Sequence, residues 1–177
     1  MTLLLRACMA FMALSCGVTA ISSARAEPVM QDKFVFSDES FGDFGTGGRS
    51  YALTSARDGT KLFATFLAVQ GGDDPVGVEF SNSSNWQAFL RLWRSANTVR
   101  AAALAQQPSP AHEDLLYTDS SGAKLSMLVL DLADAPLSVL ITQTDGHDVM
   151  FQISGARIAE VDKAIEQIST RFPASVK

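Results

Sequence analysis

Apolar and polar residues alternate in several short segments of the chain, a pattern typical of strands that bury one face. Tight-turn signals separate some of these segments, at Asp58-Gly59, at residues 120–122 and at Asp145-Gly146. The alternation predicts a chain that is rich in short strands, at residues 33–37, 50–56, 61–69, 76–81, 115–119, 124–132, 135–143 and 149–154.

Two longer segments carry apolar residues at helical spacing instead. Ser84 and Gln87 fit a capping box at the start of the first helix, and Pro108 and Pro110 stop it. Ser154 is placed to cap the second helix. The expected buried stripes are Trp86, Phe89, Leu90, Trp93 and Ala96 on the first helix, and Ile158, Val161, Ile165, Ile168 and Phe172 on the second.

The order of these elements predicts the fold class. Strands are followed by a helix twice, so we expect an α+β fold with antiparallel sheet packed against two amphipathic helices. Residues 49–177 form the expected single domain, with two similar halves at about 49–107 and 114–173. The motif Gly-x-Lys-Leu at 59–62 recurs at 122–125, each time before a long strand. This recurrence suggests a duplication.

The segment before this domain is expected to be a lead-in at residues 27–48. Its stretch FGDFGTGG at 41–48 has four glycines but neither the ending of a P-loop nor the spacing of a dinucleotide-binding loop. A turn or loop is therefore the expected structure.

Residues 1–26 have the pattern of a secretory signal peptide. Arg6 precedes an apolar run at 7–21, which is shorter than the roughly 20 residues of a bilayer-spanning helix. Ala24 and Ala26 place small residues at −3 and −1 of a cleavage site. We expect cleavage after Ala26 and a periplasmic or secreted protein. Cys16 leaves a lipoprotein as an alternative, although Ala13 and Leu14 reverse its usual order.

Composition limits the function classes. The chain has 177 residues and a net charge of −5, and removal of residues 1–26 takes away two arginines and no acid, which gives −7. Both cysteines lie within that segment, so the rest of the chain can form no disulfide. Residues 76–93 resemble the last strand and helix of a coactivator family that binds single-stranded DNA. That resemblance implies strands followed by a helix, but an acidic chain disfavours nucleic acid as a partner.

Candidate binding residues lie on the first helix. Gln87, Arg91 and Arg94 are expected on the face away from the tryptophans, where the arginine pair could bind an anionic group. The alternative is a solvated helix face.

The two histidines, His112 and His147, lie in expected loops beside acids and are weak metal candidates, since no ligand motif surrounds them. Ser154 lacks the sequence context of a nucleophile. We expect no cofactor, and a non-enzymatic protein that binds a small ligand or an envelope protein. A small exported hydrolase with a site assembled from loop residues is the alternative.

The signal-peptide pattern makes a prediction about mass. Because Ala24 and Ala26 specify the cleavage site, protein isolated from its native host should begin at Glu27. Intact-mass spectrometry measures this directly. A retained Met1, or an acylated Cys16 at the N-terminus, would contradict the prediction.

Overall fold

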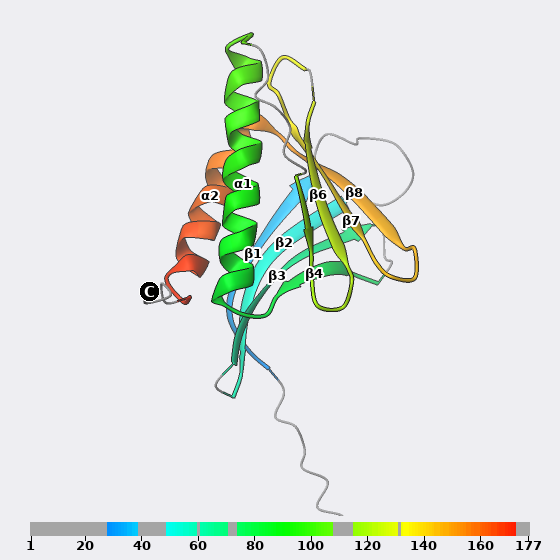
Figure 1. The fold of residues 1–177 in the computed structure, drawn as a ribbon, viewed down its shortest axis with the longest axis vertical. Helices are drawn as coiled ribbons and strands as arrows, with labels where there is room; N and C mark the ends of the chain where they lie inside the picture. Colours follow the sequence, from blue (N-terminus) through cyan, green and yellow to red (C-terminus); the bar gives the residue numbers. More distant parts are fainter. Residues whose placement is uncertain are drawn as a thin grey trace, which may run out of the picture.

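The structure, a computed structural model, describes residues 28–38, 49–59, 61–70, 74–107, 115–130 and 132–172. It contains two four-stranded antiparallel sheets and two helices, arranged as strands, helix, strands, helix (Figure 1). Sheet 1 is formed in sequence order by β1 (Val29–Asp38), β2 (Arg49–Asp58), β3 (Lys61–Gln70) and β4 (Val76–Phe80), and α1 (Ser83–Leu104) follows it. Sheet 2 is formed in sequence order by β5 (Leu116–Thr118), β6 (Lys124–Val129), β7 (Leu137–Thr142) and β8 (Asp148–Ile153), and α2 (Gly155–Ser169) follows it.

The expected α+β class is confirmed, with a strands-then-helix pattern in two halves. The Gly-x-Lys-Leu motifs, however, do not occupy matching places in the two halves. Gly59 precedes β3, the third strand of sheet 1, whereas Gly122 precedes β6, the second strand of sheet 2. Both glycines have positive φ, +58° and +92°, a backbone conformation that favours glycine. The recurring motif therefore marks a tight turn in each half.

The N-terminal segment differs from its expected role as a lead-in. Residues 29–38 form the full-length strand β1, which pairs with β2 from Val29 to Asp38 and has one irregularity between Met30 and Asp32. The short strand expected at 33–37 is therefore part of sheet 1. The Gly-rich stretch at 41–48 lies outside the described residues.

The start of α1 also differs from the expected capping box. The N-cap is Asn82, whose Oδ1 accepts a hydrogen bond from the Asn85 backbone N–H at 2.9 Å. Ser84 and Gln87 instead lie inside the helix. Asparagine and serine are both good N-caps, so the sequence does not specify which residue in such a run begins the helix. Ser154 is the N-cap of α2 by position, but its side chain makes no capping bond.

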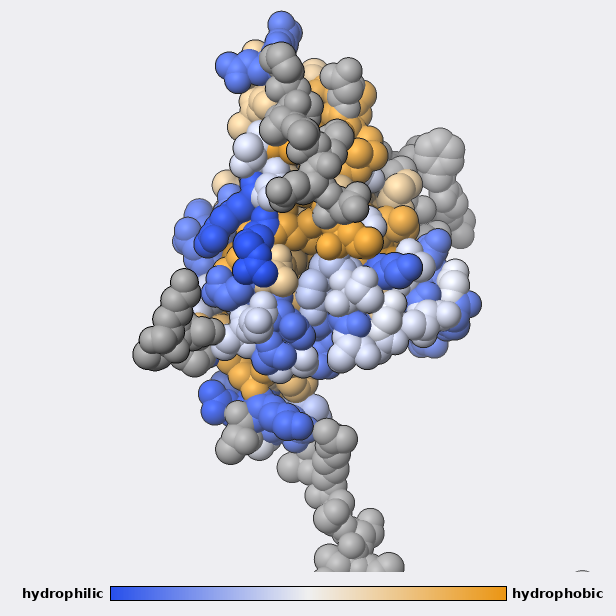
Figure 2. Space-filling model, in the orientation of Figure 1, coloured by the Kyte–Doolittle hydropathy of each residue, from blue (hydrophilic) through white to orange (hydrophobic). Residues whose placement is uncertain are grey.

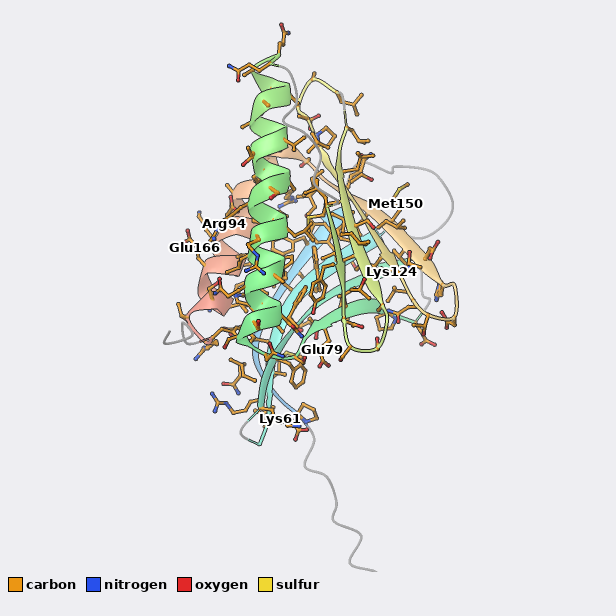
Figure 3. All side chains as sticks on the ribbon, in the orientation of Figure 1. Lys61, Glu79, Arg94, Lys124, Met150 and Glu166 are labelled. Carbon is orange, nitrogen blue, oxygen red and sulfur yellow. The ribbon has the colours of Figure 1, made fainter. Side chains whose placement is uncertain are left out.

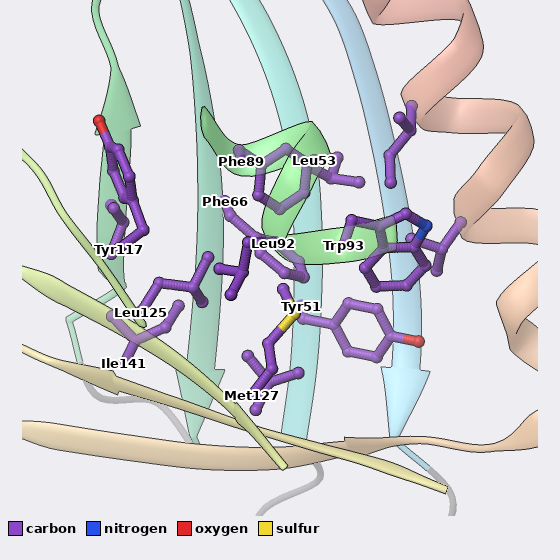
Figure 4. Packing of buried hydrophobic residues seen from close by; sticks show 14 of the residues in the cluster. Tyr51, Leu53, Phe66, Phe89, Leu92, Trp93, Tyr117, Leu125, Met127 and Ile141 are labelled. Carbon is purple, nitrogen blue, oxygen red and sulfur yellow. The ribbon is translucent and has the colours of Figure 1, made fainter. Parts of the chain in front are cut away.

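One continuous core lies on the inner face of sheet 1. β8 crosses β1, β2 and β3 at one end of this face, and α1 and α2 cover the other end (Figures 1 and 4). Phe151 of β8 stacks on Tyr51 of β2 with ring centroids 4.6 Å apart, and it meets Phe66 of β3 edge-on at 5.6 Å. Phe66 also contacts Phe89 of α1. Every residue of the two expected helical stripes is buried, so both stripes are confirmed.

Side-chain hydrogen bonds link the two sheets at the edge of β4, where the backbone pairing of sheet 1 ends. The outward edge of β4 is capped by Gln143, whose Nε2 donates to Gly77 O at 2.7 Å. Tyr117 Oη donates to Glu79 O at 3.1 Å, and Glu79 N–H donates to Asp119 Oδ2 at 3.0 Å. An exposed strand edge would offer these groups to another chain, and here sheet 2 satisfies them.

In the part of the chain that is described, neither helix has the length and apolar character needed to cross a bilayer.

Candidate functional site

The two tryptophans of α1 hold the helices side by side. Trp86 Nε1 donates a hydrogen bond to Ser169 Oγ at 3.0 Å, and Trp93 Nε1 donates to Asp162 Oδ1 at 2.6 Å. Both acceptors lie on α2. Each indole thus buries its ring in the core and satisfies its N–H on the facing helix, as buried tryptophans usually require. One bond joins the first turn of α1 to the last residue of α2, and the other joins the middle of the two helices, so together they fix the separation of α1 and α2.

An open groove of about 700 Å³ lies between the two helices. Ligand sites commonly fall between roughly 300 and 1,000 Å³. Apolar side chains from both helices and from the turn after α2 form its floor, and polar side chains surround them. The lining residues are Gln87, Leu90, Trp93, Arg94, Asp162, Ile165, Glu166, Ser169, Thr170 and Phe172.

The rim of the groove carries opposite charges on opposite helices. Arg94 lies on α1 and Glu166 on α2, on the same side of the helix pair (Figure 3). Both residues are exposed. Asp162 adds a second carboxylate on α2, one oxygen of which accepts the Trp93 bond. The groove therefore presents a cation on one wall and acids on the other, above an apolar floor.

The hydroxyl groups in the groove serve the helix backbone. Ser169 Oγ donates to Ile165 O at 2.7 Å while accepting from Trp86, and Thr170 Oγ1 donates to Gln167 O at 2.7 Å. A hydroxyl whose proton is committed to a carbonyl is not presented to a base, which a nucleophile requires. Ser169 and Thr170 therefore act as structural groups of the helix end.

Two of the three candidate binding residues on α1 line the groove, and the third does not. Gln87 and Arg94 line the groove together with Trp93, so the tryptophan and these polar residues share one site instead of opposite faces. Arg91 is exposed and does not line the groove. Sequence reasoning missed Asp162 and Glu166. Their spacing of four residues on α2, beside the buried Ile165, would have placed them on one helix face.

The remaining candidates contribute no site in the described residues. Ala24, Ala26, Cys16 and His112 lie outside these residues. His147 is exposed, and its backbone N–H donates to Asp145 Oδ1 at 3.0 Å within the tight turn expected at Asp145-Gly146. Among residues 28–172 that the structure describes, no three His, Cys, Asp or Glu side chains are grouped to hold a metal ion.

Glu79, Tyr117 and Asp119 form a cluster of titratable side chains where the two sheets meet, and their contacts serve the fold. Burial acts to raise the pKa of Asp119, but hydrogen bonds from Glu79 N–H, Ser121 and Ala123 N–H lower it overall. Burial and the nearby Asp119 charge raise the pKa of Glu79, and the pKa of Tyr117 rises to about 12 from burial and both acids. Asp119 is thus an ionised acceptor that closes a turn and caps β4.

A buried acid, Asp32, ties β1 to α2. Its carboxylate accepts hydrogen bonds from Ser55 Oγ at 2.6 Å, from Gln167 Nε2 at 3.1 Å and from Arg171 Nε at 3.2 Å. Burial acts to raise the pKa of Asp32, but these bonds and the Arg171 charge lower it overall. Asp32 is 6% exposed, so it stabilises the docking of α2 rather than contacting a ligand.

No known protein-family model matches the chain, and no curated protein does.

The Asp32 network predicts a pH-dependent loss of stability. Asp32→Asn removes the charged acceptor, so the free energy of unfolding at pH 7 should fall by about 1–3 kcal/mol. Because the folded pKa is lowered, the carboxylate stabilises the fold above the unfolded value of about 3.9 and loses this effect as pH falls through the folded pKa. The difference between parent and variant should thus be constant above about pH 5 and shrink below about pH 4.

Urea melts from pH 3 to pH 7 measure this difference. Asp74→Asn, an exposed acid in a loop, is the matched control and should leave the free energy of unfolding unchanged. A difference for Asp32→Asn that is absent at pH 7, or that grows on acidification, would contradict the network.

Proposed function

We propose that this protein is a non-enzymatic binding protein of the cell envelope that holds a peptide segment of a partner in the groove between α1 and α2. The observation that carries the proposal is the rim of the groove, where Arg94 on α1 faces acids on α2 across an apolar floor. A groove of about 700 Å³ has room for a few side chains of a bound segment.

The charges define the chemistry of the bound segment. Arg94 can form a charge-assisted hydrogen bond with a carboxylate, while Glu166 and the second oxygen of Asp162 can accept from an ammonium or guanidinium group. Leu90 and Ile165 offer an apolar contact between them. The expected segment has an acidic and a basic residue separated by an apolar one.

Binding is favoured over the alternative of an exported hydrolase because the groove's hydroxyl groups and two acids in turns already have structural partners. Ser169 and Thr170 donate to backbone carbonyls, and Asp119 and Asp145 close turns. A hydrolase would need a hydroxyl or water activated by a neighbouring base.

The location is part of the same proposal. The signal-peptide pattern at residues 1–26 supports export, and the residues of the described core run from Phe36 to Phe172, downstream of the expected cleavage point. The absence of cysteine after residue 16 suits a protein that is stable by packing alone.

A peptide-display experiment tests the groove. Selection from a random peptide library on the purified protein should enrich sequences with an acid and a base flanking an apolar residue. Arg94→Glu should weaken the selected peptides about tenfold or more, because the charge-assisted bond, worth roughly 1.5–3 kcal/mol, is replaced by repulsion. Intrinsic fluorescence titration, with Trp93 at the groove floor as reporter, measures the dissociation constant.

Arg91→Glu is the matched control, since it reverses the same charge on the same helix outside the groove. It should leave affinity within about twofold, apart from the change in net charge that both variants share. Selected peptides that bind parent and Arg94→Glu equally, or a selection without the expected charges, would overturn the proposal.

A further inference from the structure

The outer face of sheet 2 carries an apolar patch in the middle of its strands. Leu116, Leu128 and Met150 are 49%, 54% and 43% exposed, and Leu140 is half-buried between them. Leu116, Ser126, Leu140 and Met150 lie in one register row across the four strands. Figure 2 shows apolar residues gathered over sheet 2, with hydrophilic residues below them. We call Leu116, Leu128, Leu140 and Met150 the sheet 2 patch.

The neighbouring row carries one base and one acid, placed evenly about β7. Lys124 of β6 pairs in register with Thr142 of β7, which pairs with Asp148 of β8. Lys124 and Asp148 are both exposed and lie on the same face, since each is one strand away from Thr142. Two strand spacings of about 4.8 Å place their backbones roughly 10 Å apart, and among the described residues no ion pair joins Lys124 to Asp148.

This arrangement is complementary to itself. A two-fold axis that runs along β7, between two facing copies of sheet 2, exchanges the β6 side with the β8 side. Lys124 of each copy then faces Asp148 of the other, and Leu140 faces Leu140 on the axis, while Met150 faces Ser126 and Leu128 faces Gln152. Facing sheets pack about 10 Å apart with an angle of roughly 30° between their strands, distances that a lysine side chain spans.

From this geometry we propose that the outer face of sheet 2 is the interface of a homodimer. Leu140 lies at its centre with Leu128 and Met150 beside it, and two Lys124–Asp148 pairs between copies fix its register. A self-complementary patch is what a two-fold dimer requires, because the same surface serves both partners.

The size of the sheet 2 patch is compatible with a second copy of the chain as its partner. A standard interface buries about 800 Å² on each partner, slightly more than half of it apolar. Four exposed or half-buried Leu and Met side chains supply an apolar patch on the order of a few hundred Å², the size of the largest patch on a typical monomer, which is often functional. A partner of different sequence would not need the base and the acid to be symmetric about β7.

A charge-swap experiment tests the dimer. Analytical ultracentrifugation of the purified parent at micromolar concentrations should give twice the mass of one chain. Lys124→Glu places two acids opposite each other, and Asp148→Lys places two bases, so each single variant should raise the dimer dissociation constant at least tenfold. The double variant restores both pairs with reversed polarity and should return to within about threefold of the parent.

Two further variants separate the interface from general surface effects. Leu128→Glu should give a monomer, while Val35→Glu, which changes a residue 59% exposed on β1 of sheet 1, should leave the dimer intact. Circular dichroism confirms that each variant is folded. A monomeric parent at 100 μM, or a double charge-swap variant no tighter than the single variants, would overturn the proposal.

Discussion

The fold depends on apolar contact between two sheets that share no backbone ladder in the described strands. Phe151 of β8 is the centre of this contact, because it stacks on Tyr51 and meets Phe66 edge-on. The same face of sheet 1 receives α1 through Phe89. Neither sheet could bury its apolar face alone, so each half of the chain requires the other to complete the core.

This shared core explains where the polar contacts lie. They occur at its boundary, where each one satisfies a group that burial would otherwise leave unpaired. Gln143 and Tyr117 cap the edge of β4, Asp32 anchors the end of α2, and the tryptophan N–H groups bond across the helix pair. The groove opens beside the tryptophan bonds, since Trp93, Asp162 and Ser169 line it, whereas the sheet 2 patch lies on the face of that sheet away from the core.

Much of the fold could be predicted from the sequence, because period-two and helical patterns are local. The stripes ending at Ala96 and Phe172 are buried as expected. The full length of β1 was not apparent, since Asp32 interrupts the pattern and is buried only through partners on β2 and α2. The groove itself was not predicted: the sequence singled out Gln87 and Arg94 on a face away from the tryptophans, and Asp162 and Glu166 required knowledge of which helix faces meet.

Native-state hydrogen exchange tests the shared core most directly. Amides of β3, such as those of Ala64 and Phe66, and amides of β7, such as those of Val139 and Ile141, report on the two sheets separately. If the sheets form one cooperative unit, their opening free energies should merge at the same value as denaturant is added. Amides of sheet 2 that exchange through a separate opening of lower free energy, while sheet 1 stays protected, would contradict the account.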